Sequence, residues 1–257
     1  MNLVLKAELR KFLTIRSTYV LTALAIVFIV LIDFLTGYKT HSSPFNPHAF
    51  DSHAYISAAF GAIGVASLFS AIASVLVMAH EYRYNTIMYT LTASNSRSKV
   101  LASKVAVVTA YSAIIAIPLV LLGILSFHIG VSLQNVPLPP QTFDAPYILG
   151  RCLYYLIAYS LTGLLFATLI RNLVGAIAVL FLVPGIVESL LALLIKSKNQ
   201  YLPFTSLKQV ILDPGQIPPN IHFYQTNHPL RSAVTFLVYL LIGWAVGWYL
   251  FLKRDAL

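Results

Sequence analysis

Residues Val105–Phe127 of the chain read VAVVTAYSAIIAIPLVLLGILSF, a run of 23 residues without a charged side chain. An α-helix rises about 1.5 Å per residue, so roughly 20 apolar residues cross the ~30 Å hydrocarbon core of a bilayer. A helix is the expected form, because backbone N–H and C=O groups in lipid must find their partners within the chain. This run therefore predicts a transmembrane helix, and Pro118 within it predicts a kink.

Five further apolar runs lie on either side of this one. The chain of 257 residues is 58% hydrophobic and only 10% charged, whereas soluble domains average about 25% charged residues. So few charges cannot cover a water-exposed surface, which excludes a soluble enzyme. The sequence predicts an all-α polytopic membrane protein with six transmembrane helices in a single transmembrane domain, residues 1–257. The predicted spans are Tyr19–Leu35, Ala54–Ala79, Val105–Phe127, Tyr147–Ile170, Leu173–Ile195 and Ala233–Leu252.

The basic residues between the spans predict the orientation of the chain. Eleven of the 17 Lys and Arg residues fall on one side of the predicted membrane, in the N-terminal segment, after the second and fourth spans, and in the C-terminal tail. Because loops rich in Lys and Arg stay in the cytoplasm, both termini are predicted to be cytoplasmic. The net charge of +9 is interpreted in the same way, as charge that sets topology rather than charge that binds nucleic acid.

The first 17 residues predict an amphipathic helix that lies in the membrane interface. Four apolar residues at i, i+4, i+7 and i+8 form one stripe, and basic residues flank it. A basic amphipathic helix beside a span is expected to lie along the membrane surface. The alternative is a charged tail that only sets the topology. The stripe consists of Leu5, Leu9, Phe12 and Leu13.

The segment after the second span, residues 80–104, mixes charged, aromatic and apolar residues within a few positions. It begins His80-Glu-Tyr-Arg-Tyr-Asn-Thr-Ile-Met-Tyr-Thr-Leu, in which Ile87, Met88 and Leu91 are expected to form one apolar patch on a short helix. An exposed apolar patch on a short cytoplasmic helix is a candidate docking surface for a soluble partner.

Two motifs of this segment are shared with a known family. In the first motif, a Glu follows the second span, and a Thr and an apolar residue come five and six positions after it. In the second motif, a Ser-Arg pair and a Lys come before the third span. The matching residues are Glu81, Thr86, Ile87, Ser96, Arg97 and Lys104. With the six-span plan and the N-terminal segments Glu8-Leu-Arg-Lys11 and Arg16-Ser-Thr18, the chain resembles the permease subunit of an ABC-2-type ABC transporter. It departs from that family at Asn85, where Gly is common, although Asn also adopts a positive φ, and at Asn95, where Pro is usual.

The resemblance implies a permease in the cell (plasma) membrane that moves a hydrophobic or amphipathic substrate, such as a drug, peptide or lipid, out of the cell. It would form a homodimer or pair with a similar permease, contact membrane lipids and bind no nucleic acid. Residues 1–17 would be the interfacial elbow helix, residues 80–104 the coupling loop that docks a soluble ABC ATPase, and residues 196–231 an extracellular insertion with re-entrant or extracellular helices. The coupling residues would be Glu81, Tyr82, Arg83, Thr86, Ile87, Met88, Leu91 and Arg97.

The energy source is expected on another chain. No Gly-Lys dipeptide occurs in the sequence, so the Walker A motif that cradles ATP phosphates is missing. ATP and Mg²⁺ are therefore expected on the partner subunit, and no catalytic residue, cofactor or metal site is expected on this chain. His80-Glu81 lacks the second His that a zinc-protease helix needs, because position 84 is Tyr. The alternatives are a polytopic membrane enzyme and an immunity or scaffold protein without an ATPase partner.

Three ionisable residues lie inside predicted spans. Glu188 lies in the fifth span and Arg151 near the start of the fourth, and their distances along the chain from Arg171 place them at similar depth on antiparallel helices. A direct contact between Arg151 and Glu188 is predicted, because charges within a membrane usually face a partner or a cavity. The alternative is that each side chain extends separately to the outer headgroups. Asp33, near the outer end of the first span, is interpreted as interfacial.

Overall fold

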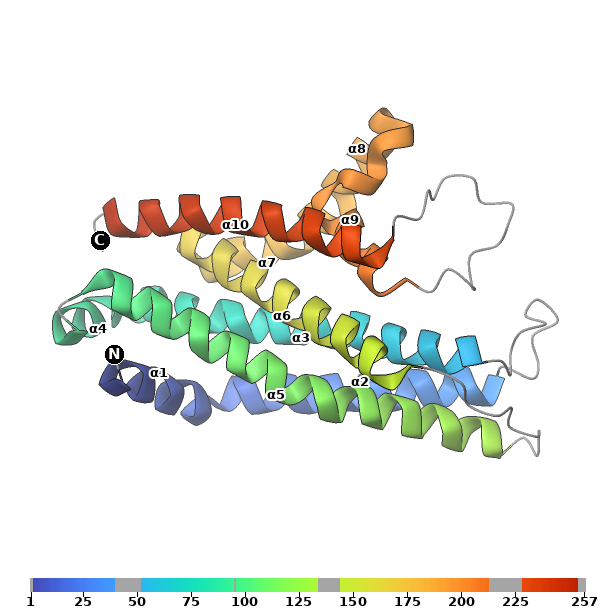
Figure 1. The fold of residues 1–257 in the computed structure, drawn as a ribbon. Helices are drawn as coiled ribbons and strands as arrows, with labels where there is room; N and C mark the ends of the chain where they lie inside the picture. Colours follow the sequence, from blue (N-terminus) through green and yellow to red (C-terminus); the bar gives the residue numbers. More distant parts are fainter. Residues whose placement is uncertain (1, 40–51, 95, 134–143, 213–227, 254–257) are drawn as a thin grey trace.

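The computed structural model describes residues 2–39, 52–94, 96–133, 144–212 and 228–253, and within these ranges the chain forms helices and short connections without a strand (Figure 1). The α-helices are α1 (Asn2–Thr14), α2 (Arg16–Lys39), α3 (Ser52–Arg83), α4 (Ile87–Ser94), α5 (Arg97–Ser132), α6 (Ala145–Ile170), α7 (Leu173–Leu182), α8 (Glu188–Ile195), α9 (Pro203–Val210) and α10 (Pro229–Lys253).

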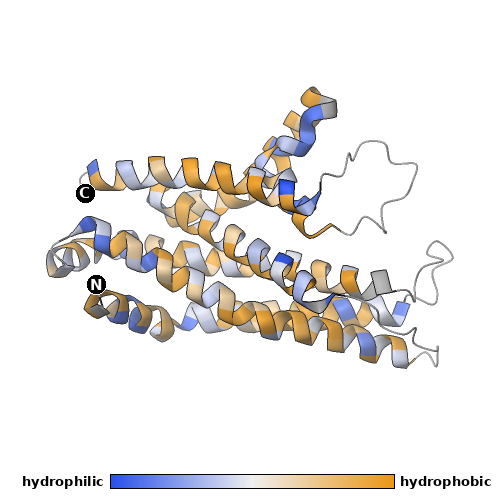
Figure 2. Ribbon diagram, in the orientation of Figure 1, coloured by the Kyte–Doolittle hydropathy of each residue, from blue (hydrophilic) through white to orange (hydrophobic). Residues whose placement is uncertain are grey.

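Six helical segments of the described chain are long and apolar enough to cross a membrane, which confirms the predicted all-α polytopic fold. Figure 2 shows that their middle parts are largely hydrophobic, whereas hydrophilic residues gather toward the ends of the bundle. The helices are longer than the predicted spans: α5 has 36 residues, which is about 54 Å at 1.5 Å per residue. Its first residues therefore extend past the apolar core, alongside α4 and α1.

The centre of the bundle is the pair α3 and α6. Their apolar windows are 72% and 61% buried, whereas those of the other four spans are at most 33% buried. Small residues bring the two backbones together: a Cβ at Gly163 would lie 2.5 Å from the carbonyl oxygen of Ala71, so only glycine fits there. Beside it, the hydroxyl oxygens of Ser70 and Ser160 are 2.7 Å apart and fully buried.

Asp33 lies within the bundle, where α2 packs against α5. Its side chain is only 2% exposed, so Asp33 is packed inside the bundle, while its place at the level of the membrane interface stays a prediction. Gly123 on α5 leaves the space that the carboxyl group occupies, because a Cβ there would lie 2.7 Å from Oδ2 of Asp33. This oxygen has no hydrogen-bond partner among the described residues.

The fifth span is interrupted rather than straight. α7 passes into a π-helical turn, Val183–Val187, at Pro184, and α8 then leaves the bundle at an angle (Figure 1). Pro184 has no backbone N–H to donate, so the regular hydrogen-bond ladder cannot continue through it. The 3₁₀ turn Lys196–Tyr201 then reverses the chain, and α9 packs against α10. By contrast, Pro118 lies within the uninterrupted α5.

Candidate functional site

The connection between α3 and α4 is a tight turn with one residue in the left-handed region. The backbone N–H of Thr86 donates to the carbonyl oxygen of Glu81 at 2.9 Å, and Asn85 has a φ of 53°. Asn85, which stands where Gly is common in the family that the chain resembles, therefore adopts a positive φ, as Asn can. The turn directs the chain from the end of α3 into α4 and leaves Glu81 pointing toward the α1 and α5 helices.

Asn85 gives the first testable prediction. Asn85→Gly is expected to leave stability nearly unchanged, whereas Asn85→Val should lower the free energy of unfolding by about 1–2 kcal/mol, because a Cβ-branched residue is strained at positive φ. Thermal unfolding of the detergent-purified protein measures both changes. Thr92→Val, on exposed α4 surface, is the matched control. Equal melting temperatures for the Gly and Val variants at position 85 would contradict the role of the turn.

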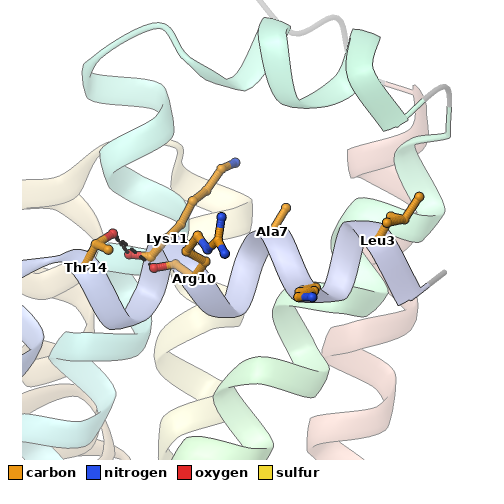
Figure 3. Close-up of a pocket in the computed structure, with 6 residues that line it drawn as sticks. Leu3, Ala7, Arg10, Lys11 and Thr14 are labelled. Atoms are coloured by element: carbon orange, nitrogen blue, oxygen red, sulfur yellow. Dashed lines mark hydrogen bonds between the residues drawn. The ribbon is translucent and has the colours of Figure 1, made fainter.

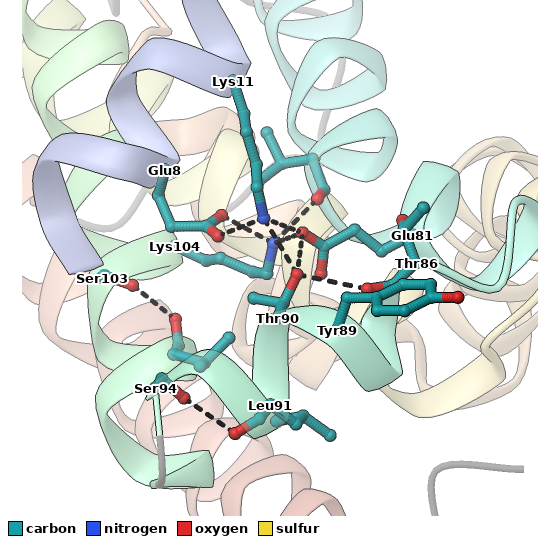
Figure 4. Close-up of polar contacts among 12 residues, drawn as sticks. Glu8, Lys11, Glu81, Thr86, Tyr89, Thr90, Leu91, Ser94, Ser103 and Lys104 are labelled. Carbon is teal, nitrogen blue, oxygen red and sulfur yellow. Dashed lines mark hydrogen bonds and ion pairs between the residues drawn. The ribbon is translucent and has the colours of Figure 1, made fainter.

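Four charged side chains from α1, α3 and α5 form a closed ion cluster beside this turn (Figure 4). The ammonium group of Lys104 is fully buried and lies 2.7 Å from Oε2 of Glu8 and 3.0 Å from Oε1 of Glu81. It also donates to the carbonyl oxygen of Val77 at 3.2 Å. A buried ammonium group is tolerated only where carboxylates and carbonyl oxygens replace its water, and here they come from two other helices.

Lys11 closes the cluster on its exposed side. Its Nζ lies 2.9 Å from Oε1 of Glu8, 2.9 Å from Oε1 of Glu81 and 2.9 Å from the hydroxyl of Thr90 on α4. Burial by itself lowers the pKa of Lys11, but its hydrogen bonds to Glu81 and Glu8 outweigh that and raise the pKa above its usual value. Two lysines thus balance two glutamates, and α1, α3, α4 and α5 are joined at one point.

α4 has an inner and an outer face. Ile87 is only 2% exposed, and Leu91 packs against the apolar cluster beneath the helix. Met88 and Tyr89 point outward, with 46% and 77% of their surface exposed. The expected single patch of Ile87, Met88 and Leu91 is therefore wrong: two of the three anchor α4, and the exposed patch consists of Met88 and Tyr89, with Tyr84 of the preceding turn beside them.

The other predicted coupling residues lie around the same turn. The guanidinium of Arg83 lies over the ring of Tyr84, with its Cζ 5.6 Å from the ring centroid. Tyr82 points to the α6–α7 connection, where Arg171 lies 5.5 Å from its ring centroid. Such distances allow cation–π attraction. Arg97 donates to the carbonyl oxygen of Leu252 at the end of α10, at 3.2 Å. Through these contacts, α3 meets the α6–α7 connection at Tyr82, and α5 meets the end of α10 at Arg97.

The apolar stripe of α1 is divided between two surroundings. Phe12 is buried against Tyr111 of α5, with ring centroids 4.7 Å apart, and Leu5 packs into the same apolar cluster. Leu9 and Leu13 are 43% and 50% exposed and face away from the bundle. Glu8, which the sequence places beside the stripe, is buried and faces inward. The helical periodicity placed the four apolar residues on one broad face of α1. It could not show that the carboxylate of Glu8 also lies on the side of α1 that packs against the bundle.

Arg151 and Glu188 do not contact each other, so the predicted direct pair is wrong. Glu188 accepts hydrogen bonds from the backbone N–H groups of Phe204 and Thr205, at 2.6 and 2.7 Å, at the N-terminus of α9. Arg151 donates to the carbonyl oxygen of Val210, at 2.6 Å, and of Leu212 beyond it, at 2.9 Å. The carboxylate thus binds the positive end of the helix dipole and the guanidinium the negative end. The short helix α9 is held between the two charges.

Charged side chains thus form two sites in the described part of the chain. The ion cluster with α4 lies at one end of the bundle, and α9 with its two charged caps lies toward the other. In the described part of the chain, no group of three or more His, Cys, Asp and Glu side chains is placed to hold a metal ion. These features define the class: a multi-pass α-helical membrane protein with a short exposed helix anchored by buried charges.

Comparison with known proteins gives the family. Residues 45–257 match the model of the family described as "Protein of unknown function (DUF2705)", and because the match covers most of the chain, the chain belongs to this family. No curated protein matches the sequence.

Proposed function

We propose that this chain is the membrane-spanning permease subunit of an ATP-driven ABC-2-type exporter, and that α4 is the helix on which a separate soluble ATPase docks. The observation that carries the proposal is the attachment of α4: its outer face presents Met88 and Tyr89, while its inner face is tied through the ion cluster to three other helices. A docking helix attached in this way passes a displacement directly to the bundle.

The proposal includes the other parts that the resemblance implies. Both termini and the α1–α4 end face the cytoplasm, α1 lies in the interface of the plasma membrane as the elbow helix, and residues 196–231 face outward. The permease pairs with a second copy or a similar permease. ATP and Mg²⁺ are bound by the ATPase, and the substrate is hydrophobic or amphipathic.

The ion cluster supports a route for coupling between the two proteins. When the ATPase moves α4, the contacts of Thr90 and Glu81 with Lys11 pull on α1, and those of Glu81 with Lys104 pull on α5. α5 continues from this point through the whole membrane. Since packed helices move as rigid bodies rather than bending smoothly, a displacement at α4 would shift α5 relative to its neighbours.

The second prediction tests the docking face itself. Replacing Met88 and Tyr89 with Ala is expected to remove a Walker-A-containing ATPase from material purified from native membranes in mild detergent, as measured by mass spectrometry. The melting temperature should change little, because neither side chain is buried. Tyr249→Ala, which removes another exposed aromatic side chain in the last turns of α10, should leave the partner bound. Purification of the unaltered chain without any ATPase, with cytosol present throughout, would refute the proposed function.

A further inference from the structure

The outer face of α1 carries a basic groove beside the ion cluster. The groove has a volume of about 540 Å³, opens to the outside, and is lined by Leu3, Lys6, Ala7, Arg10, Lys11 and Thr14 (Figure 3). Lys6 and Arg10 stand one helical turn apart, so both cations reach the same groove. Three of the six lining residues are therefore basic and none is acidic.

Two of the three cations of this groove, Lys6 and Arg10, are available to an external ligand, whereas Lys11 already binds Glu8 and Glu81. The side chains of Lys6 and Arg10 are exposed and form no hydrogen bond or ion pair with any residue that the structure describes. Glu8 is the acid nearest to them in sequence, but it faces the bundle and is already bound to Lys11 and Lys104. The charges of Lys6 and Arg10 are thus not neutralised by the neighbouring glutamate.

Apolar side chains lie on α1 beside the two free cations, since Leu9 follows Lys6 and Leu13 follows Arg10 by three positions. Leu9 and Leu13 are about half exposed, and Leu3 is 84% exposed at the end of the groove. An acidic protein surface bound to the cations would leave these leucines exposed. An amphiphile would cover them with its acyl chains while its headgroup contacts the cations. Charge and apolarity therefore lie side by side in the arrangement that a lipid with a negative headgroup requires.

We propose that the groove formed by Lys6, Arg10 and Lys11 on α1 is a binding site for the headgroup of an anionic phospholipid, whose acyl chains pack on Leu9 and Leu13. The site requires only that the chain lies in a membrane, and it does not depend on the proposed ATPase partner. Lys11 belongs both to this site and to the ion cluster that holds α4. A headgroup phosphate competes with Glu8 and Glu81 for the same ammonium, so a bound lipid loosens the hold of α1 on α4.

The test compares two lipids on the detergent-purified full chain by native mass spectrometry. Dioleoyl phosphatidylglycerol is expected to bind better than dioleoyl phosphatidylcholine, and Lys6→Gln together with Arg10→Gln should reduce the binding of phosphatidylglycerol roughly 30-fold at low ionic strength. The difference should shrink as salt is added, because exposed charges are screened. Lys99→Gln together with Lys253→Gln removes the same charge from exposed positions outside the groove, and this control should keep the preference.

Three outcomes would overturn the proposal. The first is equal binding of the two lipids by the unaltered chain. The second is an equal loss in the control variant, which would show a general effect of net charge. The third is a Lys6 and Arg10 variant that keeps its lipid but loses a soluble protein partner, which would assign the groove to that partner. Lys6 and Arg10 have no side-chain partner in the described fold, and Lys253 of the control binds only the exposed hydroxyl of Tyr249, so circular dichroism should show both variants folded.

Discussion

Replacing Lys104 with Met is expected to lower the free energy of unfolding by about 3–5 kcal/mol, the usual cost of removing one partner from a buried ion pair. Met fills much of the same volume, so the loss comes from charge rather than from a cavity. Without the Lys104 ammonium, Glu8 and Glu81 remain at the same junction with only Lys11 between them. The measurement is the midpoint of thermal unfolding in detergent, together with the yield of monodisperse protein.

A second variant separates charge balance from packing. Adding Glu8→Gln to Lys104→Met leaves one carboxylate, Glu81, and one ammonium, Lys11, so the cluster is neutral again. We expect the double variant to recover part of the lost stability, because an uncompensated buried charge costs more than a missing pair. Lys99→Met, an exposed residue on the same helix, should change the midpoint little. A single variant as stable as the unaltered protein, or a double variant less stable than the single one, would contradict the structural role of the ion cluster.

The spans were predictable because their signal is local. A run such as Val105–Phe127 contains enough apolar residues in sequence order to require burial in lipid, whatever the rest of the chain does. The positive φ of Asn85 was predictable for the same reason, since a turn between two helices restricts one residue at a time. The helix ends were less accurate, because α5 begins at Arg97 although its charged first turns carry no apolar signal.

The ion cluster could not be predicted, because it depends on which helices become neighbours. Lys11 and Lys104 are 93 positions apart, and each reads as a topology-setting charge beside a span. Glu8 and Glu81 matched a family motif, but a motif does not show that two carboxylates face the same lysine. The only signal in the sequence was the unusual placement of acids among basic residues, in the middle of α1 and at the end of α3.

The error at Arg151 and Glu188 has a definite physical cause. Equal depth on straight antiparallel helices suggested a contact, but the chain turns away at Pro184 through a π-helical turn, and α9 enters the space between the two side chains. α9 belongs to the polar insertion, residues 196–231. The resemblance implied helices in this insertion but not which of its residues return to the bundle. Both charges were correctly expected to have partners; the partners are the two ends of a helix rather than each other.

Replacing Glu188 with Gln is therefore expected to release α9 while the rest of the bundle stays folded. Glu188 accepts from two backbone N–H groups and from the hydroxyl of Thr205, at 2.6–3.0 Å. Gln keeps the size but removes the charge and places an amide NH₂ against one of these donors. Hydrogen bonds to a charged acceptor are worth about 1.5–3 kcal/mol each, so a loss of about 3 kcal/mol is expected.

Hydrogen exchange measures this release directly. A loss of 3 kcal/mol corresponds to exchange roughly 100-fold faster for amides that open with α9, and the effect should be confined to Pro203–Val210 and the facing turn of α10, where Ser232 donates to Gln209. Ser189→Ala, at the neighbouring exposed position, is the matched control. Unchanged exchange in α9 would show that its packing on α10 suffices to hold it. Faster exchange across the whole bundle would show that Glu188 supports the fold as a whole and not one helix.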